Sequence, residues 1–148
     1  MHGLLYNHVL IYALTAWSLA QIVKVPLEYF HTGRWNWALL LRAGGMPSSH
    51  SALVTGTFYG IGRIYGFDTP AFAVAFVLAM IVIYDATGIR RQAGKHAEII
   101  NAMINDLASG HPLREEQLRE VLGHTPMEAL GGVLWGFGIT QIMYMIWK

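Results

Sequence analysis

The chain has 148 residues, of which 54% are hydrophobic and only 13% charged, and its mean hydropathy is +0.39. This composition is far more apolar than that of a typical soluble domain and predicts a single membrane-embedded domain over residues 1–148. The formal net charge of +1 argues against a nucleic-acid partner, and the absence of cysteine excludes disulfides, a thiolate nucleophile and zinc–thiolate sites.

Four apolar runs approach the ~20 residues that a helix needs to cross a bilayer. They cover residues 4–23, 50–66, 70–89 and 126–147. The first run lacks a basic flank, so we expect an uncleaved span there instead of a signal peptide cleaved after residues 18–20. Glycines spaced four apart in the second and fourth runs predict close helix packing. The expected fold is all-α, a bundle of about four transmembrane helices.

Two further segments between these runs are expected to stay at the membrane surface. Residues 35–41, "WNWALLL", are too short to cross and carry aromatic residues suited to an interfacial or re-entrant position. Residues 90–107 bring Ala93, Ala97, Ile100 and Ile104 to one side at helical spacing, which predicts an interfacial amphipathic helix. Residues 109–112 end that helix, and residues 113–122 predict a second short polar helix.

Four spans place both chain ends on one side of the membrane and the two long connections, residues 24–49 and 90–125, on the other. The connections carry eight of the ten lysines and arginines, with only Arg63 and Lys148 on the opposite side. The positive-inside rule then predicts that the connections face the cytoplasm, most simply at a plasma (inner) membrane. The alternative is that several of these cations are there to bind a substrate.

The same topology brings the polar residues of the apolar runs to one membrane face. Lys24 follows the first run, Ser48-Ser49-His50 opens the second, and His124 precedes the fourth. Asp85, Arg90 and Arg91 stand at the end of the third. Separate caps and packing residues have no reason to share one side, so their convergence indicates a site.

The segment "GGMPSSHSA", residues 44–52, suits an anion. The free N–H groups and positive dipole end of a first helical turn attract phosphate, and the hydroxyls of Ser48 and Ser49 can donate to its oxygens. His50 could then protonate a leaving oxygen. The alternative interpretation is that Pro47 and the serines only start and cap a helix.

Charged residues elsewhere at this face could complete a phosphate site. Arg90 and Arg91 offer planar donors for bidentate binding, and Lys24 offers a point charge, although all three could simply anchor the chain at the membrane surface. Asp85 interrupts an apolar run, where a carboxylate is costly, so we expect it to orient a histidine or pair with an arginine.

The segment "GHTPMEALGG", residues 123–132, combines a helix start with a titratable group. Thr125 as N-cap, Pro126 at the first helical position and Glu128 two positions later predict a capping box, so Thr125 and Glu128 need no chemical role. His124 is not explained by capping and could act as nucleophile or base. A metal site using Asp85 and His124 is an alternative.

Three segments in order resemble the type 2 phosphatidic acid phosphatase superfamily, which also contains the vanadium-dependent haloperoxidases. The motifs "GGMPSSHSA", "YDATGIRRQAGKHAEIIN" and "LGHTPMEALGG" look most like the small divergent branch found in bacteria and plants, over essentially the whole chain. The resemblance implies a phosphatase that needs no metal or other cofactor. It carries phosphate binding to Lys24, Ser48, Ser49 and Arg90, and protonation of the leaving group to His50.

The resemblance leaves two candidates for the histidine that attacks phosphorus. Arg90 and His96 reproduce the superfamily's arginine, five residues, histidine spacing, but Ile89 and Ile100 replace its expected serine and aspartate. In a helix His96 would lie about 9 Å along the axis from Arg90. His124 belongs to the branch's own third motif, and we prefer it.

The function expected is therefore hydrolysis of a phosphomonoester or pyrophosphate of a membrane lipid through a phosphohistidine intermediate. Phosphatidic acid, phosphatidylglycerol phosphate and polyprenyl phosphates all fit as substrates. The rival hypothesis is a non-catalytic membrane protein that binds or transports a phosphorylated lipid or anion. The expected partners are the lipid substrate and the membrane, and homo-oligomers are left open.

Overall fold

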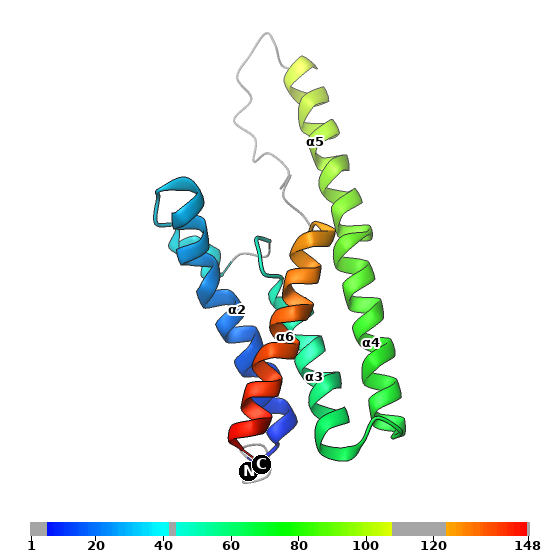
Figure 1. Ribbon diagram of the computed structural model, residues 1–148. Helices are drawn as coiled ribbons and strands as arrows, with labels where there is room; N and C mark the ends of the chain where they lie inside the picture. Colours follow the sequence, from blue (N-terminus) through cyan, green and yellow to red (C-terminus); the bar gives the residue numbers. More distant parts are fainter. Residues whose placement is uncertain (1–5, 42–43, 108–123, 148) are drawn as a thin grey trace.

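The computed structural model describes residues 6–41, 44–107 and 124–147, without the side chains of residues 89–91, 95, 102 and 105–107. The described chain is helical and contains no strand, which confirms the predicted all-α fold. Its elements are α2 (His8–Thr32), η1 (Trp37–Leu40), α3 (Ser49–Tyr65), α4 (Pro70–Thr87), α5 (Ile89–Leu107) and α6 (Pro126–Ile146) (Figure 1). The short helix predicted at residues 113–122 and its preceding turn lie outside the described residues.

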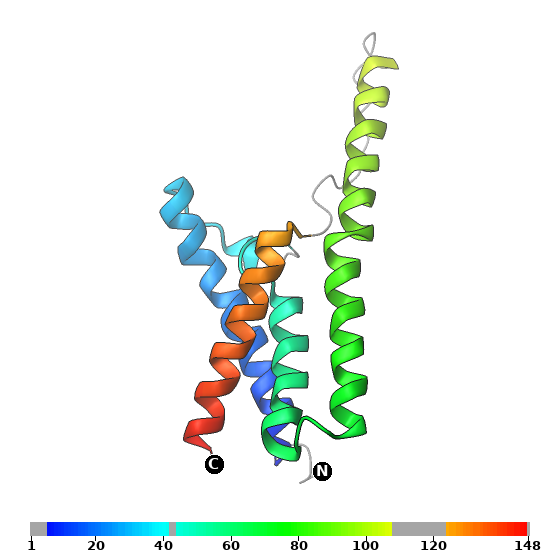
Figure 2. The same cartoon turned by 45° about the vertical axis from the view of Figure 1, so that its right-hand side comes forward.

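The four helices α2, α3, α4 and α6 form the bundle, with α3 in contact with the other three (Figures 1 and 2). Glycines set the close approach of α3 to α6. A Cβ at Gly136 would lie 2.8 Å from the carbonyl oxygen of Ala52, and one at Gly132 would overlap the carbonyl oxygen of Ser48. The predicted packing role of these glycines is confirmed, because no larger residue fits at either position without moving the α3 backbone.

Three described helical segments are long and apolar enough to cross a membrane: α2, α6, and Pro70–Asn101, which comprises α4 and most of α5. The remaining bundle helix, α3, has 17 residues and spans about 25 Å. About half of α3 is buried, and its buried positions include serine, threonine and glycine. These small and weakly polar residues suit a helix whose neighbours are mostly other helices.

The first helix extends well past the end predicted at residue 23. It continues through Lys24 and Pro26 to Thr32, and Gly33 closes it in the left-handed conformation with φ 69°. At its other end, His8 stacks on Trp147 with ring centroids 5.7 Å apart. The start of α2 and the end of α6 therefore lie on the same side of the bundle, as predicted for the two ends of the chain.

The two segments predicted at the membrane surface, residues 35–41 and 90–107, differ in how much helix they contain. Residues 35–41 contain only the single turn η1, and the exposed rings of Trp35 and Trp37 stack 5.6 Å apart. The predicted helix after residue 90 is present as α5, which follows α4 after Gly88 and continues its direction beyond the bundle (Figures 1 and 2). Among the described elements α5 contacts only α4.

Candidate active site

The start of α3 is joined to the start of α6. Ser48 caps α3, because its Oγ accepts hydrogen bonds from the backbone N–H of Ser51 at 3.3 Å and from the Ser51 hydroxyl at 3.1 Å. The backbone N–H of Ser48 donates to the carbonyl oxygen of Glu128 at 2.9 Å. Two helix N-termini, each a region of positive electrostatic potential, therefore lie side by side.

The segment before α3 approaches this junction through two glycines. Gly44 and Gly45 have φ angles of 109° and 77°, which side-chain-bearing residues rarely adopt. A Cβ at Gly45 would come within 3.9 Å of the Lys24 side chain. The glycines turn the chain so that Ser48 and Ser49 reach the helix start beside Lys24.

The structure brings His50 and His124 together. Their ring centroids are 6.1 Å apart, with the rings tilted at 57°. His124 is 3% exposed, whereas His50 is half-buried on the first turn of α3. Two imidazoles from segments 74 positions apart in the chain thus face one region at the helix N-termini.

Glu128 contacts His124 and also closes the helix cap. Its Oε2 lies 3.1 Å from Nδ1 of His124 and accepts the backbone N–H of Thr125 at 3.1 Å, while Thr125 Oγ1 accepts the backbone N–H of Glu128. The predicted capping box is confirmed, but Glu128 is more than a cap. An ionised carboxylate only accepts hydrogen bonds, so this contact favours a proton on Nδ1 of His124 and a lone pair on Nε2.

The sequence contained a signal for this contact. His124 and Glu128 are four residues apart at a helix start, a spacing that places side chains on one face. The capping box already accounted for Glu128, and for that reason the motif alone predicted no further role for it.

His124 is also tied to the end of α4. Its backbone N–H donates to the carbonyl oxygen of Ala86 at 2.9 Å. Asp85, half-buried, precedes Ala86, and α5 begins at Ile89. The backbone therefore places Asp85 and the first turn of α5, which contains Arg90 and Arg91, at the same end of the bundle as His124. The side chains of both arginines lie outside those described.

Lys24 is buried next to the start of α3, with 2% of its surface exposed. Its Nζ donates to Oε1 of Gln21 and lies 3.5 Å from Oγ of Ser49. Nε2 of Gln21 in turn donates to the carbonyl oxygen of Leu40 at 2.9 Å. Gln21 was not among the predicted site residues, although an amide one turn before a lysine in an apolar run is a recognisable signal.

His96 lies apart from these residues. It is exposed on α5, in the helix that contacts α4 alone among the described elements. The structure thus brings His124, and not His96, next to His50. Within residues 6–41, 44–107 and 124–147, no three histidine, aspartate or glutamate side chains are arranged to hold a metal ion.

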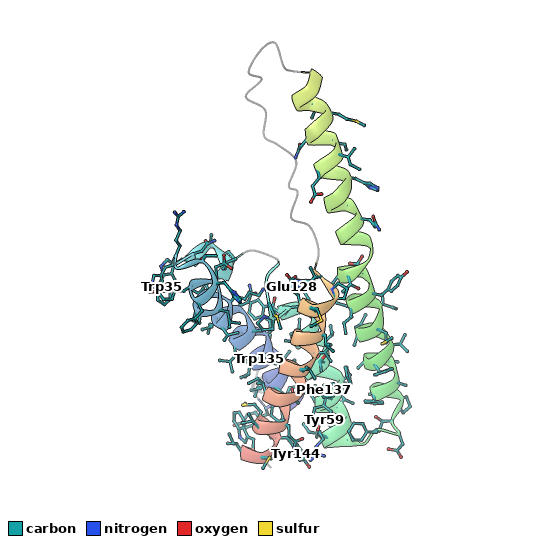
Figure 3. The ribbon with its side chains drawn as sticks, turned by 45° about the horizontal axis from the view of Figure 1, so that its top comes forward. Trp35, Tyr59, Glu128, Trp135, Phe137 and Tyr144 are labelled. Carbon is teal, nitrogen blue, oxygen red and sulfur yellow. The ribbon has the colours of Figure 1, made fainter. Side chains whose placement is uncertain are left out.

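A pocket of about 550 Å³ adjoins this cluster between α2, η1, the segment before α3 and α6. Figure 3 shows two of its residues on α6, Glu128 near the helix start and Trp135 further along. The lining residues are Val23, Lys24, Leu27, Glu28, His31, Leu39, Gly45, Met46, Pro47, Glu128, Gly131 and Trp135. Lys24 and Glu128 belong to both the pocket and the cluster.

Comparisons with known proteins agree with the arrangement of these motifs. Residues 5–139 match a family model described as the divergent PAP2 family. The chain is 38% identical over 151 aligned residues to a Bacillus subtilis (strain 168) protein described as the uncharacterized membrane protein YuiD, and the alignment covers 95% of this chain and 96% of that one. No solved structure matches the chain.

Proposed function

The chain belongs to the divergent PAP2 family, and from this premise we propose that it is an integral membrane phosphatase that hydrolyses phosphorylated lipids through a phosphohistidine. The observation that carries the proposal is the His50–His124 pair, 6.1 Å apart between ring centroids, with Oε2 of Glu128 3.1 Å from Nδ1 of His124. A two-step phosphoryl transfer needs a nucleophile and a separate proton donor, and this pair supplies both.

Phosphate would bind at the start of α3. The N-termini of α3 and α6 are joined there, and Lys24 and Ser49 lie 3.5 Å apart between Nζ and Oγ. Backbone N–H groups, a hydroxyl and an ammonium are all suited to phosphate oxygens. Arg90 and Arg91 would complete the cradle from the first turn of α5, and Asp85 would pair with them.

In the first step, Nε2 of His124 attacks phosphorus. An N–P bond forms as the ester P–O bond breaks, and His50 donates a proton to the departing alkoxide. Glu128 holds the proton on Nδ1 and stabilises the positive charge that develops on the imidazole of His124. Glu128 is thus a positioning residue in this mechanism, and His124 and His50 are the catalytic residues.

In the second step, water attacks the phosphorus of the phosphohistidine. His50, now neutral, accepts a proton from that water as the N–P bond breaks. Inorganic phosphate leaves and both histidines return to their starting protonation states. No residue of this mechanism is drawn from the exposed part of α5 that carries His96.

Release of phosphate from defined lipids tests this proposal. The purified protein would be given phosphatidic acid, phosphatidylglycerol phosphate and a polyprenyl phosphate, each with and without chelator. Release that survives the chelator supports the mechanism, whereas release abolished by it indicates a metal enzyme. Binding of these lipids without any release would favour the non-catalytic binding protein.

The orientation of the site forms part of the proposal. The positive-inside rule places the connections after α2 and α4 in the cytoplasm. The site lies at the end of α4 and beside Lys24 in the C-terminal part of α2, on the side of the bundle where those connections begin. Substrate would therefore be hydrolysed at the cytoplasmic face, most simply of the plasma membrane.

A further inference from the structure

Arg63 lies at the end of the bundle that is opposite to the proposed active site. It belongs to the last turn of α3 and contacts the end of α6. Figure 3 shows Tyr59 and Tyr144 at this end of the bundle, away from Glu128. In the part of the chain that the structure describes, Arg63 is the single lysine or arginine at this end. The positive-inside rule disfavours a cation on this side of the membrane, so a local interaction is needed to explain it.

The contacts of Arg63 within the bundle leave its hydrogen-bond donors without an acceptor. Its guanidinium carbon lies 4.4 Å from the ring centroid of Tyr144, which is a cation–π contact. The C-terminal end of α3 also suits a cation. Neither interaction supplies an acceptor, and Nε of Arg63 is buried with no hydrogen-bond partner among the described residues. No described carboxylate forms an ion pair with Arg63.

Two other side chains at this end can donate hydrogen bonds to the same ligand. The hydroxyl of Tyr59 donates to Oε1 of Gln141 at 2.7 Å, which leaves the amide N–H groups of Gln141 as donors. Gln141 lies three residues before Tyr144 on α6, and Tyr59 lies four residues before Arg63 on α3, so each pair shares one helix face. A guanidinium, an amide and a tyrosine hydroxyl therefore gather where α3 meets α6. Such a group of donors with a positive charge suits phosphate oxygens.

Exposed aromatic residues indicate the depth of Arg63 in the membrane. Tyr65, Phe67 and Trp147 are 67%, 53% and 49% exposed at this end of the bundle. Tyrosine and tryptophan are enriched at the level of the lipid headgroups. The half-buried side chain of Arg63 thus lies at the depth where lipid phosphates are the abundant acceptors.

From these observations we propose that Arg63, with Gln141 and Tyr144, binds the phosphate of a phospholipid in the leaflet opposite to the active site. This lipid is a phosphodiester that lies across the bilayer from the proposed nucleophile, so it is a bound partner and not a substrate. Its phosphate joins α3 to α6 at one end of their interface, as the hydrogen bond from Ser48 to Glu128 does at the other. Free inorganic phosphate offers the same oxygens, and the experiment below distinguishes the two sources.

Three substitutions test the proposal. Arg63→Gln removes the charge and the planar donors of the site. Arg34→Gln is the matched control, because Arg34 is exposed after the end of α2 and its loss changes the net charge equally. Lys24→Met removes the cation of the proposed active-site cradle. Thermal unfolding in an uncharged detergent, followed by tryptophan fluorescence, would be titrated with three compounds: dioctanoyl phosphatidylglycerol, dioctanoylglycerol, which has the same chains but no phosphate, and inorganic phosphate.

We expect phosphatidylglycerol to raise the melting temperature of the parent, Arg34→Gln and Lys24→Met over the same concentration range. Arg63→Gln should need about tenfold more lipid or more, because hydrogen bonds to a charged group account for that factor. Dioctanoylglycerol should give no such rise. An unchanged titration in Arg63→Gln would overturn the site. A rise with inorganic phosphate at the same concentrations, lost in Arg63→Gln, would overturn the lipid and make this a site for free phosphate.

A cross-link locates the lipid on the unmodified protein, so the test does not require that the variants fold. Phosphatidylglycerol with a diazirine on its headgroup should, on illumination, modify residues around Tyr59, Gln141 and Tyr144. Modification confined to the ends of α2 and α4 at the other membrane face would overturn the site. Neither measurement uses phosphate release, so the loss of this site would leave the phosphatase proposal standing, and a lack of release would leave this site standing.

Discussion

Glu128 and His124 are joined by a contact of 3.1 Å between carboxylate oxygen and Nδ1, and the same oxygen accepts the backbone N–H of Thr125. One side chain therefore serves both the start of α6 and the imidazole that we propose as nucleophile. The helix cap and the imidazole of His124 are linked through a single carboxylate.

The first prediction separates these two roles of Glu128. Glu128→Gln can still accept the Thr125 N–H, so the cap remains, but the negative charge beside His124 is lost. We expect kcat for lipid phosphate to fall about 100-fold or more with a small change in thermal stability. The comparison variant Thr125→Ala loses part of the cap, which costs about 1 kcal/mol of stability, and keeps most of its activity. Equal activity in Glu128→Gln and the parent would remove Glu128 from the mechanism.

A second prediction assigns the histidines by the leaving group. Without His50, attack on phosphorus continues but a lipid alkoxide leaves unprotonated. In the first turnover, measured as the burst of nitrophenol, His50→Ala should therefore recover much of its lost rate on p-nitrophenyl phosphate, whose leaving group needs no proton. His124→Ala should be inactive on both substrates, and His96→Ala should retain most activity. An inactive His96→Ala beside an active His124→Ala would make His96 the nucleophile.

The third prediction concerns the anion cradle. Lys24→Met keeps an unbranched side chain, one atom shorter, but removes the charge, so we expect vanadate to inhibit at least about tenfold more weakly. Arg90→Lys keeps charge but loses the planar donor pair, and it should also weaken vanadate binding. Vanadate inhibition measured against p-nitrophenyl phosphate checks both. Unchanged inhibition in Arg90→Ala would assign that residue to membrane anchoring.

The fourth prediction is topological and uses the absence of native cysteine. Single cysteines at positions 34 and 68 should react from opposite sides of the membrane, since position 34 follows α2 and position 68 lies between α3 and α4. A membrane-impermeant maleimide should label position 34 only in inside-out vesicles and position 68 only in intact cells. Labelling of both from one side would contradict α3 as a crossing helix, and reversed labelling would move the site to the outer face.

The sequence predicted the helices and the meeting of His50 with His124, because four apolar runs leave few ways to arrange their ends. The predicted end of the first helix was wrong, because we placed Lys24 at the end of a span. A lysine in an apolar run suggests a boundary, yet here Gln21 and Ser49 bind its ammonium and the helix continues to Thr32. Such partners come from other turns and other helices, so a pattern along the chain does not reveal them.

Glu128 also has a contact that its sequence motif does not reveal. Its capping role follows from local spacing alone, but its contact with His124 depends on the angle at which the chain enters α6. At this point the backbone N–H of His124 donates to the carbonyl oxygen of Ala86 at the end of α4, a contact with another helix that the motif does not reveal. The pocket between α2 and α6 is likewise a product of packing, since its lining comes from four separate segments.

Isolation of the phosphorylated intermediate tests the central claim most directly. Water attack in the second step uses His50 as the base, so His50→Ala treated with p-nitrophenyl phosphate should accumulate phosphoprotein. Mass spectrometry after alkaline quench should locate the phosphate on His124, in a linkage that acid destroys. Phosphate on His96, or release of nitrophenol in a full first turnover without any phosphoprotein, would contradict the account.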